Sequence, residues 1–132
     1  MTTKELSQLY YLSKEIAMNR EQLARLEAIA NSTTPQLTGM PGTVGAKDRL
    51  GKVMAEIMDV KAILELNLQK YWYEYNRLTR YIADIDDSLV RQIVKYRYEE
   101  LFSWEEVAAK IGGGNKVGSL QKSLYRYLKK HP

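Results

Sequence analysis

The chain has 132 residues, of which 45% are hydrophobic and 27% are charged, and its formal net charge is +4. These values predict one compact domain with a packed core. With no cysteine and only one histidine, His131, the chain cannot form disulfides, thiol or serine–histidine catalytic sites, or cysteine- or multi-histidine-ligated metal sites. We therefore expect a protein that is not an enzyme and that binds no metal and no cofactor.

The N-terminal stretch is charged and amphipathic, and it lacks the apolar core of a signal peptide. No apolar run in the chain is long enough to span a bilayer. The sequence therefore predicts a soluble, cytoplasmic protein without a membrane partner.

The first segment, 1–31, is predicted to be a helix with a heptad pattern. Its series are Leu9, Ile16, Leu23 and Ala30, and Leu12, Asn19 and Leu26, each with a spacing of seven residues. A linker follows over 32–46. It is rich in proline and glycine, so no helix should cross it.

The next segment, 47–85, is predicted to be one long helix with the same period. Leu50, Ile57, Leu64, Tyr71, Leu78 and Ile85 recur every seven residues. Such a helix would be about 55–60 Å long and could not bury its stripe against itself. It must pack on the first helix, on a second copy of the protein, or on both.

The heptads favour two compatible interpretations, an intramolecular hairpin and an oligomerisation arm that gives a homodimer. Asn19 and Asn67 both fall on positions where a buried polar residue can fix register or partner number. The candidate arm residues are Leu9, Ile16, Asn19, Leu23, Leu50, Ile57, Leu64 and Tyr71.

Aromatic residues are dense between Tyr71 and Tyr81. Trp72 and Tyr73 point away from the apolar stripe on a helical wheel. We expect them to pack on the C-terminal domain, and the alternative is a patch that contacts another protein.

The region 86–132 is predicted to form a three-helix domain. Asp86-Asp87 can cap its first helix, and Ser103 with Glu106 has the spacing of a capping box. Gly112 falls where a helix ends in the left-handed conformation, and the last helix is expected to start near Asn115. The whole chain is thus predicted to be all-α, with a helical hairpin followed by a helix-turn-helix.

The glycine-rich turn does not have the spacing of a phosphate-binding loop. Gly113 and Gly118 match the glycines of a P-loop, but Ser119 stands where the lysine should be. The dinucleotide fingerprint also fails, because Val117 stands where its third glycine would be. We therefore interpret these glycines as turn residues.

The positive charge is concentrated at the C-terminal end. No acidic residue follows Glu106, whereas Lys110, Lys116, Lys122, Arg126, Lys129 and Lys130 all do. Nucleic acid is the commonest partner of such a basic end, and a solvated lysine-rich helix is the alternative.

The run from Arg91 to Leu128 resembles region 4 of bacterial sigma factors, and more closely the sigma-like phage regulators of the ArpU and RinA type. The matching residues are Arg97-Tyr98, Trp104-Glu105-Glu106-Val107-Ala108, Ile111-Gly112, Val117 and Leu120. The resemblance implies a phage or prophage transcription regulator that binds double-stranded DNA through its helix-turn-helix. One departure is that the turn is a residue shorter than is usual in the family, which predicts an unusual angle for the last helix.

Taking Val117 and Leu124 as the buried centre of the last helix gives candidate DNA contacts. For base edges the candidates are Asn115, Lys116, Ser119 and Lys122. For phosphates the candidates are Lys110, Arg126, Lys129 and Lys130. The arm would then dimerise the protein or present it to a partner such as RNA polymerase.

Two alternatives remain open at the level of sequence. One is a DNA-packaging protein resembling small terminase subunits, although these usually carry the DNA-binding part first. The other is a helical module that binds only proteins, through the heptads or through Trp72 and Tyr73.

Overall fold

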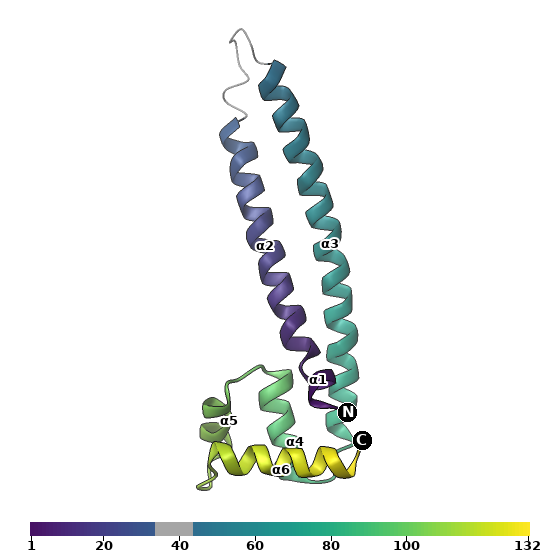
Figure 1. Ribbon diagram of the computed structural model, residues 1–132, viewed down its shortest axis with the longest axis vertical. Helices are drawn as coiled ribbons and strands as arrows, with labels where there is room; N and C mark the ends of the chain where they lie inside the picture. Colours follow the sequence, from purple (N-terminus) through teal and green to yellow (C-terminus); the bar gives the residue numbers. More distant parts are fainter. Residues whose placement is uncertain (34–43) are drawn as a thin grey trace. The chain divides into compact units, whose positions relative to one another are not determined.

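The computed structural model describes residues 1–33 and 44–132, and all secondary structure in these two ranges is helical. The elements are α1 (Thr3–Leu6), α2 (Gln8–Thr33), α3 (Val44–Ala83), α4 (Ser88–Val94), the π-helix η2 (Lys95–Glu99), α5 (Trp104–Ile111) and α6 (Val117–Lys130), as Figure 1 shows. The all-α prediction with a long central helix is confirmed. Much of the expected linker, residues 34–43, lies outside the described residues.

The element boundaries differ from those expected from the sequence. The first helical segment is broken at Ser7 and reaches Thr33, and the long helix spans Val44–Ala83 in place of 47–85. The chain divides into two compact units, Met1–Leu12 with Tyr71–Pro132, and Ser13–Lys70. The C-terminal unit is therefore larger than the predicted domain 86–132.

The unit Ser13–Lys70 is a hairpin of α2 and α3, which run antiparallel side by side (Figure 1). Its core contains residues from both heptad series: Leu26, Ala30, Ile57 and Val60 are buried, with Leu23, Leu50 and Val53 packed against them. The heptad residues of this unit thus pack on one another within a single chain, as the intramolecular interpretation predicts.

A polar pair lies inside the hairpin. Asn67 is 5% exposed, and its Nδ2 donates a hydrogen bond of 2.8 Å to Oδ1 of Asn19. The same nitrogen lies 3.5 Å from Oε2 of Glu15. A buried amide that finds its partner only in one alignment disfavours slipped registers, because a slip would leave both groups unsatisfied. The two asparagines thus bond to each other between α2 and α3, and their expected function in fixing the register stays a prediction.

The other unit has a core to which α1, α2, α3, α4, α5 and α6 contribute. Leu6 and Leu9 are each 1% exposed, which explains why the first twelve residues belong to this unit. Around them pack Leu78, Ile82, Ile85, Val90, Ile93, Val94, Tyr98, Val107, Leu120 and Leu124. Figure 1 shows α6 lying across the end of α4 and beside α5, with both chain termini near the end of α6.

Polar contacts join the long helix to other elements of this unit. The Tyr75 hydroxyl donates a 3.0 Å hydrogen bond to Glu99 of η2, and this bond raises the pKa of Tyr75. Arg77 pairs with Glu5 of α1 at 3.0 Å. These contacts fix α1 and η2 against the end of α3.

The expectation that Trp72 and Tyr73 pack on the C-terminal domain is wrong, because neither belongs to the core of that unit. Their side chains are 55% and 68% exposed, although the Trp72 ring touches Tyr71 and Tyr75 edge-on. The apolar stripe of α3 makes the contacts of this helix with the core. Trp72 and Tyr73 lie outside that stripe.

No helix in the ranges 1–33 and 44–132 is both long enough and apolar enough to cross a membrane.

We predict that Asn67→Asp destabilises the fold by about 1–3 kcal/mol at neutral pH, because a buried carboxylate would replace an amide donor next to Glu15. Burial beside Glu15 would raise the pKa of this carboxyl group, so the deficit should shrink as pH falls from that raised pKa toward about 4, where the protonated group is again a neutral donor. Urea unfolding at several pH values measures both effects. Gln69→Glu, the same chemical change at an exposed position of the same helix, is the control. Equal stabilities of the two variants would contradict a register function for the pair.

Candidate nucleic-acid interface

The elements α4 and η2 precede the two helices of the candidate interface, α5 and α6. As predicted from sequence, an aspartate caps α4: Asp87 accepts hydrogen bonds from the backbone N–H groups of Leu89 and Val90, at 2.9 and 3.2 Å. The helix then widens into η2, and Leu101 follows with a φ of 62°, which is unusual for a residue with a branched side chain. The helical stretch ends here, since η2 runs only to Glu99.

Contacts hold the connection from η2 to α5 in place. Arg97 donates a 2.9 Å hydrogen bond to the Phe102 carbonyl, and its guanidinium lies 5.3 Å from the centre of the Trp104 ring. The predicted capping box is present, because Ser103 Oγ accepts from the Glu106 N–H and Glu106 accepts from the Ser103 N–H. The start of α5 is thus fixed both by its own residues and by η2.

The connection from α5 to α6 is a glycine turn. Gly112, Gly113 and Gly114 all have positive φ, at 65°, 66° and 74°, where a Cβ would be strained. Asn115 closes the turn, because its backbone N–H and its side-chain Nδ2 both donate to the Gly112 carbonyl, at 3.2 and 3.0 Å. The interpretation of these glycines as turn residues agrees with this geometry.

The last helix begins later than expected, at Val117 and not near Asn115. Lys116 is its N-cap residue, with extended backbone. The Lys116 N–H donates to Ser119 Oγ at 3.3 Å, and the Ser119 hydroxyl donates to the Lys116 carbonyl at 2.9 Å. The three positive-φ glycines and the Asn115 bonds extend the turn, so Asn115 and Lys116 precede the helix.

The buried centre of α6 also differs from the expected one. Leu120 and Leu124 are fully buried and pack in one core with Val107 of α5, whereas Val117 is only partly buried. The helix is therefore rotated relative to the expected wheel. Its outermost side carries Gly118, Lys122, Tyr125, Arg126 and Lys129, all of which are exposed.

The structure separates the candidate residues into groups. Ser119, Lys122, Arg126, Lys129 and Lys130 are exposed on α6, and Lys116 is exposed just before it. Lys110 is exposed on α5, with its ammonium 5.9 Å from the centre of the Phe102 ring. Asn115 is partly buried and occupied in the turn. Asn115 is thus the base-contact candidate that the structure disfavours.

Sequence reasoning missed Gly118 and Tyr125 on the outermost side of α6. Tyr125 is 50% exposed. The signal that could have found both residues is the pair Leu120 and Leu124, because centring the helical wheel on two leucines brings Gly118 and Tyr125 to the opposite side.

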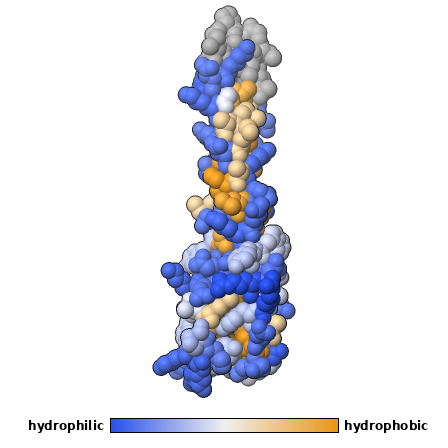
Figure 2. All heavy atoms as spheres, turned by 90° about the vertical axis from the view of Figure 1, so that its right-hand side faces the viewer, coloured by the Kyte–Doolittle hydropathy of each residue, from blue (hydrophilic) through white to orange (hydrophobic). Residues whose placement is uncertain are grey.

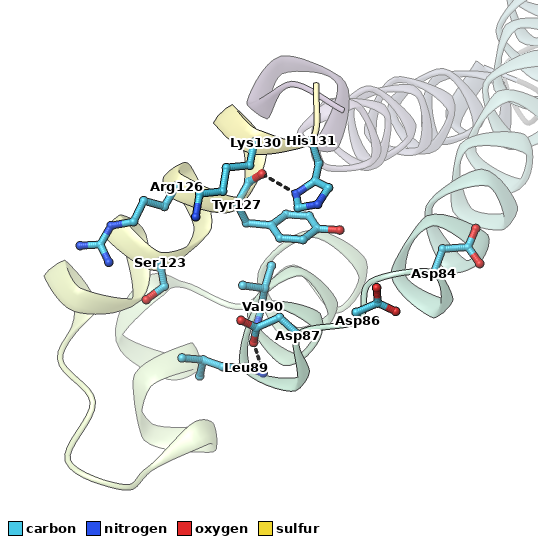
Figure 3. A pocket seen from close by; sticks show the side chains of 10 residues that line it. All are labelled: Asp84, Asp86, Asp87, Leu89, Val90, Ser123, Arg126, Tyr127, Lys130 and His131. Carbon is cyan, nitrogen blue, oxygen red and sulfur yellow. Dashed lines mark hydrogen bonds between the residues drawn. The ribbon is translucent and has the colours of Figure 1, made fainter.

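A shallow cavity of about 500 Å³ lies beside this helix. Asp84, Asp86, Asp87, Leu89, Val90, Ser123, Arg126, Tyr127, Lys130 and His131 line it (Figure 3). The His131 ring stacks on Tyr127, and the Arg126 side chain extends away from the aspartates (Figure 3). Burial, reinforced by the aspartates, raises the pKa of Tyr127. In the described ranges, no cluster of histidine, aspartate and glutamate could hold a metal ion.

No protein-family model matches the chain. No curated protein is detectably similar to it. No solved structure is detectably similar to it.

We predict that Asn115→Ala lowers the free energy of unfolding by about 0.5–1.5 kcal/mol, because the turn loses the hydrogen bond from the Asn115 side chain to the Gly112 carbonyl. Thermal or urea unfolding measures the change. Asn76→Ala is the matched control at an exposed position inside α3, where alanine should be neutral or stabilising. Equal effects of the two substitutions would show that Asn115 does not hold the turn.

Proposed function

We propose that the protein is a non-enzymatic, sequence-specific DNA-binding regulator that meets double-stranded DNA with α6. The observation that carries the proposal is the basic outer side of α6. Lys122, Arg126 and Lys129 are exposed there, and none forms an ion pair with another described residue. Unpaired cations on one helix side suit a chain of phosphates, because binding releases the counterions of the DNA.

The arrangement of α5 and α6 supports a helix-turn-helix as the binding unit. The two helices share a core through Val107, Leu120 and Leu124 and are joined by a glycine turn. In such motifs the second helix enters the major groove and its first turns face the base edges. We assign Lys122 to that position, and Arg126 and Lys129 to phosphates, because the Ser119 hydroxyl already donates to and accepts from the Lys116 backbone.

The assignment to transcription rests on the resemblance of 91–128 to region 4 of sigma factors and to the ArpU and RinA type of phage regulator. In this proposal Arg97 and Trp104 have a structural role, because their cation–π contact stabilises the start of α5. In this proposal, the helical arm formed by α2 and α3 contacts a second copy of the protein or RNA polymerase.

The test is fluorescence anisotropy of the protein with a pool of labelled DNA fragments over a range of salt concentrations. Contact with about five phosphates predicts a log–log slope of roughly −4 to −5. Arg126→Ala should weaken binding to every fragment and reduce the magnitude of the slope by about 1, whereas Lys122→Ala should change the order of preference among fragments.

The control for this test is Lys52→Ala, which removes an exposed lysine from α3. It should leave both the slope and the order of preference unchanged. If the protein binds all fragments weakly and added salt abolishes this binding, the basic residues of α6 bind DNA only through non-specific electrostatic attraction. That result would contradict the proposed function as a regulator.

We propose that the homodimer forms through the outer side of α3, because the heptad residues are used within the chain. Ala55, Met58, Ala62 and Leu66 follow one another at helical spacing and are all exposed, Met58 by 71% and Leu66 by 51%. Figure 2 shows apolar side chains forming a band along the arm, bordered by hydrophilic ones. Small residues between larger ones let a second helix approach closely, which suits an equal helix from another copy.

We predict that the double substitution Met58→Glu with Leu66→Glu converts a dimer into a monomer without loss of helix, since both side chains are exposed. Light scattering measures the mass and circular dichroism the helix content. Met18→Glu is the control, an apolar-to-acid change on α2 at 66% exposure. A wild-type protein that stays monomeric at high concentration would contradict the dimer, and a ring-sized mass would favour the packaging-protein alternative.

A second candidate function is a protein-binding module. The exposure of Trp72 and Tyr73 on α3 favours it, because exposed aromatic side chains are common anchors in interfaces. If that function is the correct one, Lys122→Ala and Arg126→Ala should leave partner binding intact, and Trp72→Ala should abolish it.

A further inference from the structure

Gly118 is the one glycine on the outer side of α6. It lies in the first turn of the helix, between the exposed residues Lys116 and Lys122. Lys122 follows it by one helical turn on the same side, and Tyr125 follows Lys122 by another. The position is therefore at the front of the surface proposed to face DNA.

No contact with the described residues requires a glycine at this position. Unlike Gly112, Gly113 and Gly114, Gly118 has ordinary helical backbone, and a Cβ built on it would meet no atom within 4 Å. The start of the helix does not depend on it either, because the bonds there are made by Lys116 and Ser119.

Glycine in a helix has a cost, since its unfolded backbone is freer than that of any other residue. A glycine kept at an open helical position without an internal use lowers stability and brings no packing in return. Such a glycine leaves the helix backbone uncovered on its exposed side. Another molecule can therefore come closer to the helix axis there than at the neighbouring residues.

We propose that Gly118 is a specificity-determining residue, the point at which α6 comes closest to the floor of the DNA major groove. The absence of a side chain lets the helix enter deeply enough for Lys122 to reach a base edge and for the Tyr125 ring to lie against the groove wall. The groove is about 12 Å wide and about 8.5 Å deep, so a helix with side chains fills it and one methyl group changes the fit. This inference rests on the proposed DNA-binding function.

The experiment uses the full chain and the DNA fragment that the wild type prefers. Gly118→Ala should weaken specific binding about tenfold or more, in line with the loss of one good base contact. Gly118→Gln should weaken it further, because the side chain is longer. Binding to unrelated fragments should stay as in the wild type, because every basic residue remains. The melting temperature of Gly118→Ala should equal or exceed that of the wild type by about 1–4 °C.

The matched controls are Gly51→Ala and Gly51→Gln. Gly51 is likewise helical, exposed and without any atom within 4 Å of a built Cβ. These variants should have a similar gain in melting temperature and unchanged DNA binding. They separate an effect of glycine on helix stability from an effect of the site.

The outcomes separate the two proposals. A wild type that prefers no fragment contradicts the proposed function. A wild type that prefers one fragment, together with Gly118→Ala that binds it equally tightly, leaves the function standing and overturns this inference. A fall in melting temperature for Gly118→Ala would also overturn it, because the glycine would then have an internal use.

Discussion

The apolar stripe of α3 is the constraint on which the rest of the structure depends. A helix as long as Val44–Ala83 exposes its stripe unless other elements cover it, and this chain covers it in two different ways. The half around Ile57 and Val60 is covered by α2, and the half around Leu78 and Ile82 belongs to the core of the C-terminal elements. The two compact units follow from this division of one stripe.

Polar residues decide the alignment where apolar ones are interchangeable. Leucine and isoleucine stripes can pack in more than one register, whereas the bond from Asn67 to Asn19 forms in one. In the other unit, the hydrogen bond from Tyr75 to Glu99 has a comparable structural role, because it joins α3 to η2 at one position. Both contacts cost desolvation, and in exchange they make one arrangement more stable than its neighbours.

The parts of this fold that sequence could predict are those determined within a few residues. The caps at Asp87 and Ser103 follow from residue types at fixed spacing, and the glycine turn follows from the need for positive φ. The heptad positions were also predictable, because their period does not depend on which partner covers them.

The parts that sequence could not predict depend on residues far apart in the chain. The burial of Leu6 and Leu9 among C-terminal residues has no local signal, and neither has the wider turn of η2. The basic composition of α6 is visible in the sequence, because the excess of lysine is local, but the side that α6 exposes is not. That side is set by the burial of Leu120 and Leu124 with Val107, a contact between helices.

The glycine turn and the exposed surface of α6 belong together. The turn built on Gly112, Gly113 and Gly114 is closed by the Asn115 side chain, so Asn115 is occupied inside the turn. The exposed surface then begins one step later, at Lys116, and its outermost line runs through Gly118, Lys122 and Lys129. In the proposed complex with DNA, the side chains along this line limit how closely α6 approaches the floor of the groove. An open glycine in the first turn of the helix is the change that permits a closer approach without altering the core beneath it.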